Sequence, residues 1–196
     1  MVQSGRDVAI CDATLALLLE VGYDRMSMDA IAARAHASKA TIYRRWPGKQ
    51  ELVLDAVKAR GVGLTVAEDT GSLRGDLVAT YRSAVHGSAA DDADLIAGVL
   101  RAMRTAPELA DCVRSQVIES KCDVSRVIVA RAVARGELPA ETDPLILHEV
   151  ASALWFHRVL VVGGPVDDAF IAHVVDDVLM PLLDRSSRSA ELQETQ

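Results

Sequence analysis

Residues 27–46 have the sequence SMDAIAARAHASKATIYRRW, which predicts two short helices joined by a tight turn. Ser27 is expected to cap a first helix over residues 28–35, and Ser38 a second one, because a serine hydroxyl accepts a hydrogen bond from a free N–H of the first helical turn. The connection between the helices is too short for antiparallel packing. The stretch therefore predicts a helix-turn-helix, whose second helix is free to enter a major groove.

The second helix of this pair is expected to have one buried and one outward face. Because successive residues of a helix turn by about 100°, Ile42 and Trp46 lie about 40° apart and should face the core. Ala40 and Arg44 then point in the opposite direction. Arginine bonds bidentately to guanine and alanine allows close approach to a thymine methyl, so this face is typical of base readout. Lys39 lies in the first turn, the end that reaches base edges in such motifs.

Phosphate contacts are expected from the flanks of the motif. The hydroxyls of Ser27, Thr41 and Tyr43 and the ammonium of Lys49 are placed for them. The whole predicted DNA-binding set is Ser27, Ser38, Lys39, Ala40, Thr41, Tyr43, Arg44 and Lys49. Two simpler interpretations stay open: Arg44 as an ordinary solvated charge, and Tyr43 as a ring that only covers its helix.

The charge of the chain is unevenly distributed. Its 196 residues have a net charge of −7 at pH 7, which by itself argues against a nucleic-acid partner. Residues 1–60, however, contain nine Lys and Arg against seven Asp and Glu, a net charge of +2, and residues 25–50 contain six against one. Residues 61–196 contain twelve against twenty-one, a net charge of −9. This predicts a DNA-binding domain over 1–60 and a larger acidic domain over 61–196.

Apolar residues recur with helical spacing nearly throughout the chain, and no stretch shows the alternation of a strand. The predicted fold class is all-α with about nine helices, the first three forming the helix-turn-helix domain. The predicted helices cover residues 6–22, 28–35, 39–46, 49–60, 72–89, 92–104, 107–135, 143–162 and 167–185.

Composition excludes several classes of protein. With 50% hydrophobic residues the chain can bury a core, which excludes general disorder. The three cysteines are scattered without a CxxC spacing, as expected of small core residues in a reducing cytosol. Charged and polar residues interrupt the apolar stretch 145–162, so a buried helix is expected there and not a membrane span. We expect a soluble, cytoplasmic protein without a membrane partner.

Catalytic and metal sites are not expected. His148, His157 and His173 are spaced by nine and sixteen residues, which matches no metal-ligand pattern. The sequence also has no discernible nucleophile–base pair or phosphate-binding loop. We therefore expect no enzyme activity, no metal and no cofactor.

Residues 6–60 resemble the N-terminal DNA-binding domain of the tetracycline-repressor (TetR) family of transcriptional regulators. In that family Gly-Tyr or Gly-Phe ends the first helix, Ser or Thr starts the second, and S-x-x-T-[IL]-Y forms the recognition helix before an aromatic residue and a Lys. The corresponding residues here are Gly22-Tyr23, Ser27 to Ala32, Ser38 to Tyr43, Trp46 and Lys49. His36 departs from the pattern, because it stands at the turn position where the family has Gly and where a left-handed backbone is expected. Ala40 and Arg45 also differ from the common family residues, which alters base preference.

The resemblance implies a homodimer whose C-terminal helices bind a small molecule and pair as a four-helix bundle. The helices predicted over 143–162 and 167–185 are rich in apolar residues, as expected of helices that pack on their own core and on a partner. We expect a ligand-responsive repressor that binds a palindromic double-stranded DNA operator as a dimer through these last two helices.

A pocket for the small-molecule effector is expected among aromatic and polar residues of the larger domain. The candidates are Tyr81, His86, Met103, Trp155, Phe156 and His157. Residues of these types belong more often to the plain core or to a dimer interface than to a pocket, and that interpretation stays open for each of them.

An alternative function is a small-molecule-binding dimeric helical protein without DNA-binding activity. The acidic larger domain suits that alternative. The presence of Lys39, Thr41, Tyr43, Arg44 and Lys49 in the helix-turn-helix argues against it.

Overall fold

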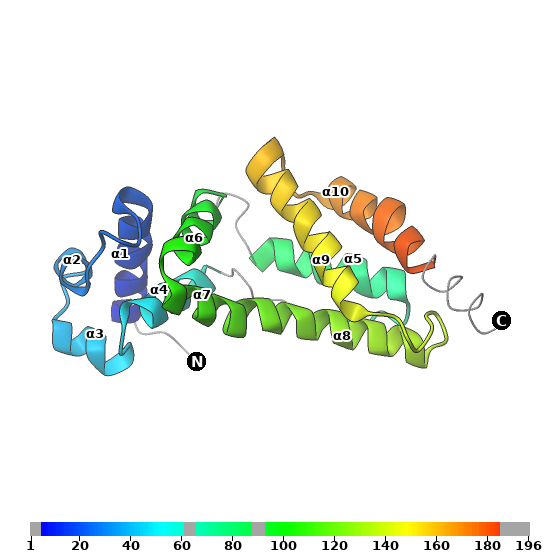
Figure 1. Ribbon diagram of the computed structural model, residues 1–196, viewed down its shortest axis with the longest axis horizontal. Coiled ribbons are helices and arrows are strands. Elements are labelled where there is room, and N and C mark those ends of the chain that lie inside the picture. Colours follow the sequence, from blue (N-terminus) through cyan, green and yellow to red (C-terminus); the bar gives the residue numbers. More distant parts are fainter. Residues whose placement is uncertain (1–4, 61–65, 88–92, 185–196) are drawn as a thin grey trace. The chain divides into compact units, whose positions relative to one another are not determined.

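The computed structural model describes residues 5–60, 66–87 and 93–184, with side chains up to residue 85 in the second range. These residues form helices and no strand, so the all-α prediction is confirmed (Figure 1). The chain divides into two compact units, each described by itself below. The first unit comprises residues 1–63 and 91–118, and the second comprises residues 64–90 and 119–196.

The first unit is built around α1. Its helices are α1 (Gly5–Val21), α2 (Met28–Arg34), α3 (Lys39–Arg45), α4 (Lys49–Ala59), α6 (Ala93–Thr105), α7 (Pro107–Val113) and the π-helical η2 (Arg114–Ile118). Helix α1 packs against α2, α4 and α6, and α4 also packs against α7. Ile10 and Leu18 of α1 and Leu52 of α4 are almost fully buried in the shared core. The predicted boundary between two domains at residue 60 stays a prediction. In the structure, residues 91–118 cluster with residues 1–63, because α6 packs on α1 and α7 packs on α4.

The second unit contains the remaining helices. They are α5 (Leu73–Gly87), α8 (Glu119–Ala134), α9 (Pro144–Phe156), which continues into the π-helical η3 (His157–Val162), and α10 (Asp168–Ala172), which continues into η4 (His173–Leu179) and on to residue 184. Helix α8 packs against α5 and α9, and α5 also packs against α10 and η4. With each unbroken helical stretch taken as one helix, the described residues form nine helices, and the predicted helix ends that fall within the described ranges lie within two residues of the observed ones. The predicted ends at residues 89, 92 and 185 lie outside the described residues.

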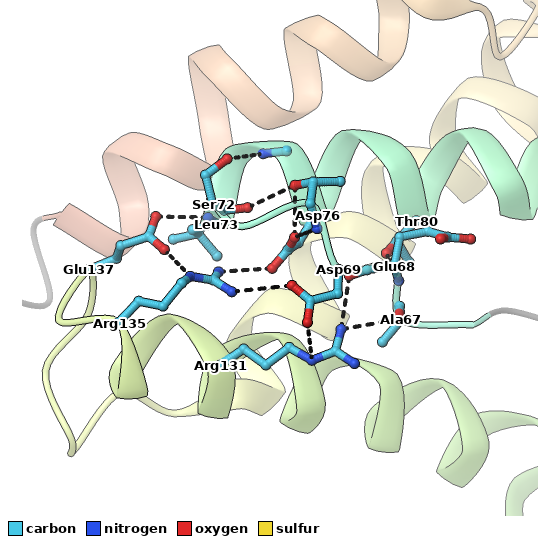
Figure 2. Close-up of polar contacts among 12 residues, drawn as sticks. Ala67, Glu68, Asp69, Ser72, Leu73, Asp76, Thr80, Arg131, Arg135 and Glu137 are labelled. Atoms are coloured by element: carbon cyan, nitrogen blue, oxygen red, sulfur yellow. Dashed lines mark hydrogen bonds and ion pairs between the residues drawn. The ribbon is translucent and has the colours of Figure 1, made fainter.

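A polar network fixes the segment that leads into α5 (Figure 2). The carboxylate of Asp76 is fully buried and accepts hydrogen bonds from the Thr70 N–H at 2.6 Å and from Arg135 Nη2 at 2.8 Å. Burial alone would raise the pKa of Asp76, but these hydrogen bonds outweigh it and hold that pKa below its ordinary value. Arg131 donates to the carbonyl oxygens of Ala67 and Glu68. The network therefore ties residues 67–70 to the C-terminal end of α8.

Candidate nucleic-acid interface

The turn between α2 and α3 is fixed by two serine caps and one left-handed residue. Ser27 Oγ accepts a hydrogen bond from the Ala30 N–H, and Ser38 Oγ accepts one from the Thr41 N–H, both at 3.2 Å. His36 has φ +50°, so the expected left-handed backbone at this non-glycine position is confirmed. Helix α3 therefore starts at a defined point and in a defined direction.

The inward face of α3 is anchored in the core of the first unit. Ile42 is fully buried and Trp46 is 2% exposed, as the helical spacing predicts. The Trp46 indole N–H also donates to Asp55 Oδ2 of α4 at 2.9 Å. Ala40 and Arg44 are exposed, so the face opposite to this anchor is open to a partner.

The two adjacent arginines of α3 differ in their contacts. Within the described part of the chain Arg44 forms no ion pair and no hydrogen bond. Arg45 is partly buried, lies over the Trp46 ring at 5.2 Å and approaches Asp7 Oδ2 to 3.6 Å. Arg44 is therefore the arginine of this pair whose guanidinium is available for base edges, whereas Arg45 supports the packing of α3 on α1.

The remaining polar groups of this surface keep donors for a phosphate. Tyr43 is 48% exposed, and Lys39 forms an exposed ion pair with Asp29 of α2. The Ser38 and Thr41 hydroxyls lie 2.9 Å apart, so one of them donates to the other and the second hydroxyl hydrogen stays free. The structure thus permits the predicted DNA contacts of this surface, which stay predictions. They involve Lys39, Ala40, Thr41, Tyr43 and Arg44.

Lys49 has a structural role that the sequence did not reveal. Its ammonium donates to the carbonyl oxygens of Tyr23 at 2.8 Å and Met26 at 3.2 Å, and lies 4.0 Å from the centre of the Tyr23 ring. Burial lowers the pKa of Lys49. Because an ammonium has three donors, one remains for the predicted phosphate contact. The pairing of a Gly-Tyr helix end with a Lys at the start of α4 was the available signal for this tie.

The effector candidates lie in different surroundings. Tyr81 of α5 and Trp155 of α9 are partly buried in the second unit, whereas Phe156 and His157 are exposed there. The Trp155 and Phe156 rings meet edge to face at 5.2 Å. Met103 packs against the core of the first unit instead. The side chain of His86 lies outside the described residues.

One partly buried cation of the second unit was not predicted from the sequence. Lys121 of α8 lies with its ammonium 5.9 Å from the centre of the Trp155 ring. The available signal was its position four residues before Ser125 and seven before Ile128, both of which are buried, because residues at these spacings share one helix face. Among the described residues no group of three or more His, Cys, Asp or Glu side chains is arranged to hold a metal ion.

Comparisons with known proteins cover both units. Residues 10–56 match the family model of bacterial regulatory proteins, tetR family, and residues 67–178 match that of the tetracyclin repressor-like C-terminal domain. The DNA-binding transcriptional repressor TetR of Mycobacteroides abscessus is 41% identical over 184 residues, which are 93% of this chain and 96% of that protein. An uncharacterized HTH-type transcriptional regulator of Mycobacterium tuberculosis is 35% identical over 184 residues, 94% of this chain and 91% of that protein. The crystal structure of a TetR family transcription regulator superimposes with a TM-score of 0.60 at 25% identity, over 90% of this chain and 97% of the other.

Proposed function

Because the chain belongs to the tetR family of bacterial regulatory proteins, we propose that two copies of α3 enter successive major grooves of a palindromic operator. The chain is a transcriptional regulator with a helix-turn-helix DNA-binding domain. The observation that carries the proposal is the division of α3 into a face anchored by Ile42 and Trp46 and an open face bearing Ala40 and Arg44.

The proposed contacts divide into base readout and phosphate positioning. Arg44 bonds to a guanine edge, and Ala40 allows the helix to approach closely. Lys39 reaches the groove from the first turn of α3. The hydroxyls of Ser27 and Tyr43, the one hydroxyl hydrogen that the Ser38–Thr41 pair leaves free, and the third donor of Lys49 bind phosphate oxygens and fix the register of the helix. The complete proposed set is Ser27, Ser38, Lys39, Ala40, Thr41, Tyr43, Arg44 and Lys49.

Dimerisation through the last two helices is supported by the exposure of apolar side chains on α9 and η3. Leu145 is 39% exposed, Phe156 37% and Val161 73%. The prediction that this stretch is a buried helix is wrong for the single chain, because only 11% of an 18-residue window of the helix over 144–162 is buried. By length and composition alone, with a mean hydropathy of 1.5 over that window, the helix would be able to cross a membrane. One such helix is weak evidence for a membrane span, and a second copy of this chain explains the exposure equally well. The proposed location is the cytoplasm, where the operator is.

An effector bound in the second unit would regulate the dimer through the spacing of its two α3 helices. Major grooves on one face of DNA recur about every 34–36 Å, so a shift of a few ångströms removes one helix from its groove. A small molecule achieves this if it binds one spacing more tightly than the other. Tyr81 and Trp155 are the partly buried aromatic residues that we place at this site.

Selection of bound sequences from random duplex DNA tests the proposed function. We expect an inverted repeat with half-site centres about 10 base pairs apart. We also expect an affinity that falls steeply with salt, because each phosphate contact releases a counterion. If the protein binds no duplex at low ionic strength, the proposal is refuted. The function that then remains is the alternative, a small-molecule-binding dimer that does not bind DNA.

A further inference from the structure

Lys121 differs from the described arginines of its unit, because no described residue gives it an oxygen partner. Among the described residues its ammonium forms no ion pair with a carboxylate and no hydrogen bond. Every arginine in the described part of the second unit does contact an oxygen atom. These arginines are Arg74, Arg82, Arg126, Arg131, Arg135 and Arg158.

The surroundings of Lys121 are aromatic and partly withdrawn from water. His148 and Trp155 lie seven residues apart on α9, two helical turns along one face, and α9 packs on α8. Burial lowers the pKa of Lys121, and burial followed by the positive charge of Lys121 lowers the pKa of His148. A partly buried ammonium without a counter-charge costs free energy that an entering anion recovers.

Tyr81 provides a second polar group that has no partner among the described residues of the same unit. It lies on α5, which also packs against α8. Among the described residues its hydroxyl forms no hydrogen bond, while burial raises the pKa of the phenol. A partly buried hydroxyl and a partly buried ammonium on neighbouring helices are the kind of sparse polar groups that orient a ligand in a mainly apolar site.

We propose that the effector is an organic acid whose carboxylate pairs with Lys121 of α8 and whose apolar body packs against the indole of Trp155 on α9. This inference rests on the proposed function, because it names the ligand class of the effector site. A carboxylate supplies the counter-charge that no described residue gives to Lys121. A flat or aliphatic body fits the indole face, which a cation-only or strongly polar ligand would leave uncovered.

The test compares acids with their neutral amides on the full-length protein. Four pairs serve as probes: benzoate and benzamide, 2-naphthoate and 2-naphthamide, indole-3-acetate and indole-3-acetamide, and octanoate and octanamide. Binding is measured by calorimetry on wild type, Lys121→Met, Lys121→Arg and the control Lys58→Met, which removes a lysine of the first unit that is hydrogen-bonded to Gln116. We expect at least one acid to bind wild type about tenfold or more tightly than its amide, as expected for a charge-assisted contact.

The variants decide whether Lys121 carries this preference. Lys121→Met should remove the preference for the acid, whereas Lys121→Arg and Lys58→Met should keep it. The inference is overturned if no acid is preferred by wild type, or if Lys121→Met keeps the preference. DNA binding without ligand is measured in parallel on the selected operator. If the wild-type protein does not bind DNA, the proposed function is refuted. If it binds DNA but prefers no acid over its amide, only the proposed ligand class is refuted.

Discussion

Replacement of Arg44 by alanine is the sharpest test of which face of α3 reads DNA. The guanidinium of Arg44 is exposed and has no ion pair or hydrogen bond within the described residues. Its removal therefore breaks no hydrogen bond or ion pair among the described residues, and the free energy of unfolding should change by less than about 0.5 kcal/mol. Any larger effect on DNA affinity then reports the loss of a contact with DNA and not damage to the fold.

The expected loss of affinity follows from one bidentate contact in each half-site. Such a contact contributes about 1–3 kcal/mol of discrimination, which corresponds to about 5- to 150-fold in affinity. In a dimer the two contacts are far apart and add, so the operator as a whole should lose about 2–6 kcal/mol. On an operator whose contacted guanine is changed in both half-sites, Arg44→Ala should cost little further affinity, because the variant has nothing left to lose at that position.

Fluorescence anisotropy on the selected operator and on a set of single-base variants measures both quantities. The control is Arg101→Ala, which removes an exposed arginine of α6 in the same unit that has no ion pair within the described residues. Arg101→Ala should leave the ranking of the operator variants unchanged. Our assignment would be refuted if Arg44→Ala weakened the affinity for every operator variant equally and reduced the salt dependence of log affinity by about one per half-site. Arg44 would then be a phosphate contact.

Three further substitutions probe other parts of the molecule. Asp29→Asn removes the ion-pair partner of Lys39 and a negative charge from the proposed DNA-facing surface. The affinity for the operator at low salt should therefore rise about fivefold, equivalent to about 1 kcal/mol. An unchanged affinity in anisotropy titrations would contradict this. Asp76→Ala should lower the free energy of unfolding by about 3 kcal/mol at pH 7 in urea denaturation. Because the folded pKa of Asp76 is depressed, that difference should be constant above about pH 5 and shrink as the pH falls further, whereas a constant difference down to pH 2 contradicts the depressed pKa. Phe156→Glu should give monomers in sedimentation analysis, because Phe156 lies in the proposed dimer interface. The control Leu19→Glu changes an exposed apolar position of the first unit and should leave the dimer intact. A dimeric Phe156→Glu protein contradicts the proposed interface.

The helix-turn-helix was predictable because its determinants are local in the sequence. The hydroxyls of Ser27 and Ser38 cap the helices that follow them directly, and the 3.6-residue period alone places Ile42 and Trp46 inside. Capping residues, glycines and prolines predicted the helix ends within two residues wherever those ends fall in the described ranges. The left-handed backbone at His36 followed from its place in the family pattern and not from its residue type.

The candidate sites were less predictable because their contacts join segments far apart in the chain. Lys49 binds carbonyl oxygens 23 and 26 residues before it, a tie that no local pattern indicates. The candidates Met103 and Trp155 belong to different units, although both are large apolar residues on helices. Sequence shows that a residue belongs on a buried stripe, but it does not show which other helix covers that stripe.

Three cations of this chain illustrate what the sum of charges conceals. Among the described residues, Arg44 is exposed and has no hydrogen-bonding or ion-pair partner, Lys49 is bound to carbonyl oxygens, and Lys121 lies beside the Trp155 ring without an oxygen partner. DNA presents many charges at once, so it should bind where positive charge is collective, as in residues 25–50 with six cations and one anion. The net charge of −9 over residues 61–196 opposes such a polyanion, but salt screens it beyond about 8–10 Å. A small acid experiences mainly the nearest partly desolvated ammonium, so an acidic domain can repel DNA and still bind a carboxylate at Lys121.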